Sequence, residues 1–71
     1  MNNSDKKEFA QTMKLAAIAY DREFDPSMMR AYFEFLEDYS VDQIKVAVKA
    51  HCKGTGVESK FFPKVADITA Q

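Results

Sequence analysis

Residues 24–44 read FDPSMMRAYFEFLEDYSVDQI, and this stretch is the most informative about the fold because it holds two helix starts with an apolar helix between them. At the first start, Asp25 can cap the helix and Pro26 is preorganised for the first helical position. At the second start, Ser40 is followed three residues later by Gln43, which is the spacing of a capping box. The stretch therefore predicts two consecutive helices.

The first of these helices, over residues 26–38, is the most hydrophobic predicted element. Some of its apolar residues recur at spacings of three and four, which places them on one helical face, and others widen that face. The first set is Met29, Tyr32, Phe33 and Leu36, and the second is Met28, Phe35 and Tyr39. Glu34, Glu37 and Asp38 lie on the same helix and form either a solvated face or an acidic docking edge.

The second of these helices, over residues 41–53, carries two faces of different character. Its inward face is Val41, Ile44, Ala47, Val48 and His51. Lys45, Lys49 and Lys53 repeat every four residues on another face, and we call them the lysine row. Gly54 stands where a left-handed C-cap would end the helix.

An amphipathic helix is also predicted toward the N-terminus, over residues 5–22, where Asp5 and Glu8 have the spacing of a capping box. Its core face is Phe9, Met13, Ala16, Ala17 and Tyr20. Leu15 and Ile18 project from the far side of this helix. Either the helix lies between two others and buries both flanks, which is common in small bundles and which we favour, or the two side chains form an exposed patch for a partner.

The end of the chain predicts a loop and one more short helix. Both glycines lie within residues 54–60, which is typical of a loop. Pro63 then restricts Phe62 to an extended conformation, and a short helix follows over residues 64–70. The residues expected to close the core are Phe62, Val65 and Ile68.

The whole chain, residues 1–71, is therefore predicted to be one all-α domain: a small bundle of three main helices with a short fourth C-terminal helix. Its 46% hydrophobic and 13% aromatic residues exclude disorder of the whole chain, although the polar start, residues 1–4, can stay disordered. A single cysteine, Cys52, excludes an internal disulfide and fits the reducing cytosol. We expect neither a signal peptide nor a membrane-spanning helix, and hence a cytoplasmic protein.

Charge is unevenly distributed along the chain, although the net charge is only -1. Residues 21–39 hold two arginines and six acids, whereas residues 40–71 hold five lysines and three acids. The lysine row could contact phosphates, but it contains no arginine and its helix lacks residue types suited to reading bases. Nucleic acid is therefore not the direct partner that we expect.

Candidate catalytic residues do not assemble into a plausible active site, so we expect no enzyme. His51 and Cys52 are adjacent on a helix and diverge by about 100°, so they cannot readily act as a catalytic pair or chelate one metal together. The histidine is better explained as a core residue with a hydrogen-bond partner. Glycine-rich phosphate loops and complete calcium loops are absent as well, and no cofactor or metal is expected.

The order of these elements and the closing segment Lys60-Phe61-Phe62-Pro63-Lys64-Val65-Ala66-Asp67-Ile68 resemble a known family. The matching residues are Glu8-Phe9, Tyr20, Tyr32-Phe33, Leu36, Asp38-Tyr39-Ser40, Val46 to His51, and the closing Phe-Pro-x-x-Ala-Asp-Ile. The chain resembles the N-terminal helical domain of a phage helicase-loader family, which includes the loader and inhibitor of the replicative helicase in a Bacillus phage. The resemblance covers nearly the whole chain.

This resemblance implies a phage or prophage DNA-replication accessory protein. Such a protein binds a DnaB-type replicative helicase or an origin initiator, and delivers or restrains the helicase. In the family, a flexible C-terminal extension follows the folded domain, whereas this chain stops at Gln71. We therefore expect either a fragment or a member that retains only the folded docking module.

The expected contact regions are Leu15, Ile18, Glu34, Glu37, Asp38, Lys45, Lys49 and Lys53. Two other functions stay open: a small phage inhibitor that binds a host defence or replication enzyme, and, less favoured, a direct DNA-binding module. The excess apolar surface of the first two helices would also suit a homodimer.

Overall fold

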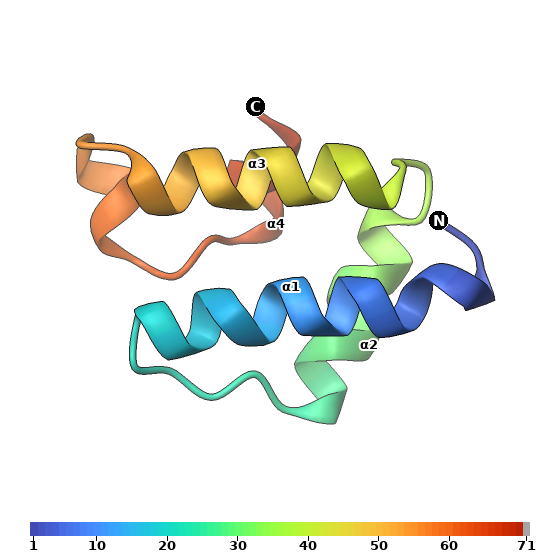
Figure 1. Ribbon diagram of the computed structural model, residues 1–71. Coiled ribbons are helices and arrows are strands. Elements are labelled where there is room, and N and C mark those ends of the chain that lie inside the picture. The colour runs from blue at the N-terminus through green and yellow to red at the C-terminus, as the bar shows by residue number, and fades with distance from the viewer. Residues whose placement is uncertain (71) are drawn as a thin grey trace.

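Three main helices and a short fourth make up the fold in the computed structural model, which describes residues 1–70 (Figure 1). The elements in chain order are η1 (Asn3–Asp5), α1 (Lys6–Ala19), α2 (Pro26–Leu36), α3 (Val41–Lys53), η2 (Val57–Lys60) and α4 (Val65–Thr69). Helices α1 and α3 lie side by side and run in the same direction, α2 crosses α1 steeply and ends near the start of α3, and α4 packs against α3 and α2. The predicted all-α bundle is confirmed.

The starts of α2 and α3 follow the predicted caps. The Asp25 carboxylate accepts a hydrogen bond from the Met28 N–H at 2.8 Å. Ser40 and Gln43 form a complete capping box, in which each side chain accepts a hydrogen bond from the other residue's backbone N–H. These contacts satisfy amide groups that a helix start leaves unpaired.

The start of α1 differs from the prediction. In the part of the chain that the structure describes, Asp5 makes no side-chain cap to α1, so the predicted Asp5 and Glu8 box is wrong. The chain enters instead through the 3-10 turn η1, and Asn2 and Asp5 form the capping box one turn earlier. The polar start thus forms a capped turn.

The end of α1 comes earlier than residue 22 because Asp21 takes a left-handed conformation, with φ of 52°. The Arg22 N–H donates to the Ala17 carbonyl at 2.9 Å, and the Asp21 N–H donates to the Ile18 carbonyl at 3.2 Å. This is the hydrogen-bond pattern of a Schellman motif. Aspartate serves here because its short polar side chain tolerates that backbone region better than most L residues.

Gly54 does not end α3 as predicted. Its φ is -69° and its backbone is extended, so the expected left-handed C-cap is wrong. The helix ends instead with a tightened last turn, in which the Gly54 N–H donates to the His51 carbonyl at 3.2 Å.

The core lies where α1, α2, α3 and α4 meet. The buried apolar residues are Phe9, Met13, Ala16, Ala17, Leu36, Ile44, Ala47, Val48, Phe62 and Ile68. Phe62 is the aromatic centre of the closing segment, with its ring centroid 5.8 Å from that of Phe24 and 6.2 Å from that of Tyr20. The predictions that Phe62 and Ile68 close the core are confirmed.

Three side chains form hydrogen bonds with backbone carbonyls of residues 59–63, the segment that precedes α4. The Tyr20 hydroxyl donates to the Ser59 carbonyl at 2.6 Å, and the Tyr32 hydroxyl donates to the Pro63 carbonyl at 2.9 Å. Between them, the His51 Nε2 lies 2.8 Å from the Phe61 carbonyl oxygen and therefore acts as the donor. The carbonyls of residues 59, 61 and 63 are thus paired with side chains from the C-cap of α1, from α3 and from α2. These contacts hold a segment that has little helical structure of its own.

Candidate protein-docking groove

Leu15 and Ile18 lie on an exposed flank of α1, where their side chains are 68% and 77% exposed. The favoured prediction, that the first helix buries both flanks, is therefore wrong. Helix α2 crosses α1 instead of lying along it, so it covers a short part of α1 and leaves this flank in solvent (Figure 1). The exposure of both side chains agrees with the alternative prediction, in which they form an exposed apolar patch.

A groove of about 430 Å³ runs between α1 and α3. Its lining residues are Glu8, Gln11, Thr12, Leu15, Ala16 and Ala19 from α1, and Lys45, Val48, Lys49, Cys52 and Lys53 from α3. The structure thus brings Leu15 and the whole lysine row together in one concave site, whereas Ile18 lies outside its lining. We call this site the α1–α3 groove.

The two ends of the α1–α3 groove differ in charge. At one end, the Lys45 ammonium lies 3.3 Å from the Glu8 carboxylate, so each charge has a partner. Within residues 1–70, Lys49 and Lys53 form no ion pair, and both are exposed. The second end is therefore the one at which two positive charges remain available to a ligand.

The end of the α1–α3 groove that holds Lys49 and Lys53 is also its more apolar end. Leu15 lies about 10 Å further along α1 than Glu8, away from the ion pair, and also lines the groove. Ala16 and Val48 are buried and form the floor here, while Leu15 and Ala19 stand exposed beside it. Small alanine side chains keep the groove open, and Leu15 offers a large apolar contact.

Cys52, the chain's single cysteine, is half-buried in the α1–α3 groove, whereas His51 points into the core. Their divergence and the buried role of His51 are as predicted. The His51 Nδ1 is buried without a hydrogen-bond partner among the described residues.

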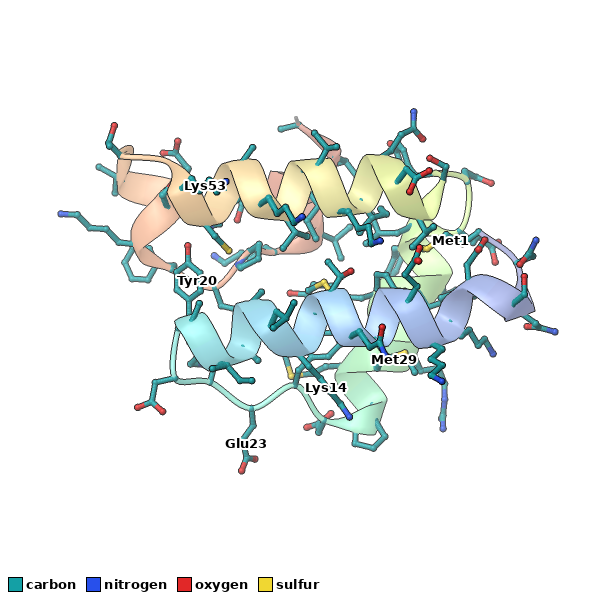
Figure 2. The ribbon with its side chains drawn as sticks, in the orientation of Figure 1. Met1, Lys14, Tyr20, Glu23, Met29 and Lys53 are labelled. Carbon is teal, nitrogen blue, oxygen red and sulfur yellow. The ribbon has the colours of Figure 1, made fainter. Side chains whose placement is uncertain are left out.

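Tyr20 points from the end of α1 toward the end of α3, where Lys53 lies (Figure 2). Burial raises the pKa of the Tyr20 hydroxyl above 10.0, and Cys52 and Asp67 raise that pKa further.

The acidic edge, Glu34, Glu37 and Asp38, lies on a separate surface. All three side chains are exposed, and Glu34 and Glu37 line a smaller hollow of about 260 Å³ beside Lys6. The N-terminal ammonium of Met1 donates to the Glu37 and Tyr39 carbonyls, which places a positive charge at the C-terminal end of α2. The structure therefore does not unite the acidic edge with the α1–α3 groove.

Val46, Val57 and Phe61 are exposed apolar side chains outside the predicted contact regions. Val46 is 68% exposed and lies beside the junction of α3 and α4, and Phe61 is 61% exposed beside Arg22 and Lys64. A sequence signal for Phe61 existed, because adjacent residues in an extended segment point to opposite sides and Phe62 is buried.

The described residues contain neither a cluster of metal-ligand side chains nor a helix that could cross a membrane. Across residues 1–70, no three His, Cys, Asp or Glu side chains gather as metal ligands would. In the same part of the chain, no helix has both the length and the apolar character needed to cross a membrane.

A family model for the N-terminal domain of the phage gene 39 protein matches residues 5–69. The chain belongs to this gene 39 protein N-terminal domain family. It is therefore a helical domain related to phage replication. The matched span of the domain contains every residue that lines the α1–α3 groove. No curated protein and no solved structure matches the chain.

Proposed function

We propose that this gene 39 protein-type domain is a DNA-replication accessory module that binds a DnaB-type replicative helicase or an origin initiator and delivers or restrains it. The observation that carries the proposal is the family match over residues 5–69, which assigns the fold to a phage helicase-associated group. On this proposal the domain works in the host cytosol by binding alone, without catalysis or a cofactor.

The α1–α3 groove supports a protein as the partner. An exposed Leu15 beside a concave floor provides apolar area of the kind found at the centre of protein interfaces. The lysine row along one side provides charge that can orient a partner of opposite sign. Ile18, just outside the groove, extends the apolar surface along α1.

The direct test is binding to purified replication proteins. The full chain is immobilised, and the host replicative helicase hexamer and the initiator are passed over it separately. We expect one of the two to be retained, and retention of neither would contradict the proposal. With the retained helicase, a change in its loading on single-stranded DNA or in its unwinding rate then distinguishes delivery from restraint.

A matched pair of variants tests the surface itself. Leu15→Ser with Ile18→Ser should weaken binding and leave helicity unchanged, because both side chains are exposed. Val57→Ser is the control, since Val57 is similarly exposed but lies outside the α1–α3 groove. Circular dichroism confirms the fold of each variant, and equal binding by all forms would contradict the use of this flank.

A further inference from the structure

We infer that the α1–α3 groove receives an acidic amphipathic helix of the partner protein. This inference rests on the proposed function, which supplies a protein partner, and it adds the chemistry that the partner must present. The features that carry it are the unpaired charges of Lys49 and Lys53 and the apolar end formed by Leu15 and Ala19.

The spacing of the lysine row fits carboxylates on a helix. Residues four apart on a helix are about 6 Å apart along its axis and share one face. A partner helix that lies along α3 therefore presents carboxylates four residues apart at the same repeat as Lys49 and Lys53. This match requires no change in the exposed lysines beyond side-chain rotation.

The apolar side of the groove fits the other face of such a helix. Ala16 and Val48 form a buried floor, and Ala19 allows close approach of a partner backbone. Leu15 can pack on a large apolar side chain one turn from the partner's carboxylates. An occupant with an acidic stripe next to an apolar stripe thus matches both sides of the groove.

Nucleic acid fits the α1–α3 groove less well. Its lining contains no arginine among residues 1–70, and Glu8 places a negative charge on the α1 side. Phosphate backbones gain little from the apolar area of Leu15 and Ala19. DNA is therefore an outcome of the test and not the proposed occupant.

The test uses a capped synthetic helix with glutamates at every fourth position and leucines along the adjoining stripe. Fluorescence anisotropy measures its Kd for the full chain. Lys49→Glu with Lys53→Glu should weaken binding roughly tenfold, through loss and reversal of two ion pairs. A second peptide, with lysines in place of the glutamates, should show the opposite preference and bind this double variant more tightly than the wild type.

Lys14→Glu with Lys7→Glu is the matched control, because these exposed α1 lysines lie outside the groove lining and carry the same charge change. Lys14 points away from α3 in Figure 2. The control should change the Kd less than twofold. Equal weakening by both double variants, no peptide binding, or preferential salt-sensitive retention of duplex DNA would overturn the inference.

Repeating the measurement with the purified helicase and initiator separates this inference from the proposed function. If a replication protein binds the wild type and the Lys49→Glu, Lys53→Glu variant equally, the groove inference is overturned and the proposed function stands. If neither replication protein binds while the acidic peptide does, the proposed function is contradicted and the site for an acidic helix is supported.

Discussion

The Lys45 ammonium and the Glu8 carboxylate lie 3.3 Å apart and join α3 to α1 across one end of the groove. Both side chains are partly exposed, so this ion pair contributes little to folding, on the order of 0.5 kcal/mol. The ion pair matters more for binding, because Glu8 neutralises Lys45, one member of the lysine row, and its negative charge repels an acidic ligand.

Glu8→Gln should therefore strengthen binding of the acidic peptide about threefold, since it frees Lys45 and removes a like charge from the groove. The Kd at low ionic strength is the measurement, and the gain should shrink as salt is added. Glu34→Gln, an exposed carboxylate outside the groove, is the control and should have a smaller effect. Weaker binding by Glu8→Gln would contradict the assigned role.

Cys52 provides a native probe of the α1–α3 groove. Because its thiol lines the groove and the chain has no other cysteine, a bound partner should slow its alkylation by a small maleimide several-fold. Mass spectrometry follows the rate with and without the partner. The control combines Cys52→Ser with Ser27→Cys at an exposed position of α2, where the rate should not change. Unchanged alkylation of Cys52 at saturating partner would place the contact elsewhere.

Asp21 is the one non-glycine residue with positive φ among residues 1–70. Replacement with glycine removes the left-handed strain, at some cost in unfolded-state entropy, so Asp21→Gly should raise the free energy of unfolding by about 0.5 kcal/mol. Asp21→Val should lower it by about 1 kcal/mol or more, because a β-branched residue tolerates this conformation poorly. Urea denaturation measures both. A destabilised glycine variant would contradict the Schellman assignment.

Stability should fall at alkaline pH through Tyr20 and Tyr32. Burial raises the pKa of both hydroxyls above 10.0, with Asp67 adding to each and Arg22 opposing the shift at Tyr32. A raised folded-state pKa gives stability that is fully present below about pH 10 and lost as pH rises through the folded values. The phenolates can no longer donate to the Ser59 and Pro63 carbonyls.

Chemical denaturation between pH 8 and 12 measures this loss. Tyr20→Phe with Tyr32→Phe should be less stable by about 1 kcal/mol for each lost hydrogen bond at pH 8. The same variant should then show a shallower decline above pH 10, because its two titrating groups are gone. An equally steep decline in both proteins would show that other groups, such as the lysines, account for the alkaline loss.

Much of the fold follows from local chemistry that a sequence displays. The caps at Asp25 and Ser40 depend on contacts within three residues, so both could be predicted. The end of α1 at Asp21 could not, because aspartate adopts the left-handed region far less readily than glycine. The prediction of a left-handed C-cap at Gly54 failed for the converse reason, since glycine permits the left-handed conformation without requiring it.

Only those features of the candidate site that depend on a single helix could be predicted from the sequence. The lysine row and the outward direction of Leu15 follow from helical periodicity within one element. That they share a groove depends on α1 and α3 being neighbours while α2 crosses α1, which is a property of the whole packing. Local patterns alone carry no information on that arrangement.

Backbone amide shifts in the isotope-labelled chain, followed as its purified replication partner is added, show directly whether the partner binds in the α1–α3 groove. We predict that the largest changes lie on the facing sides of α1 and α3, around Leu15, Lys49 and Lys53. Changes confined to the acidic edge at Glu34 and Glu37, with the groove unaffected, would contradict it.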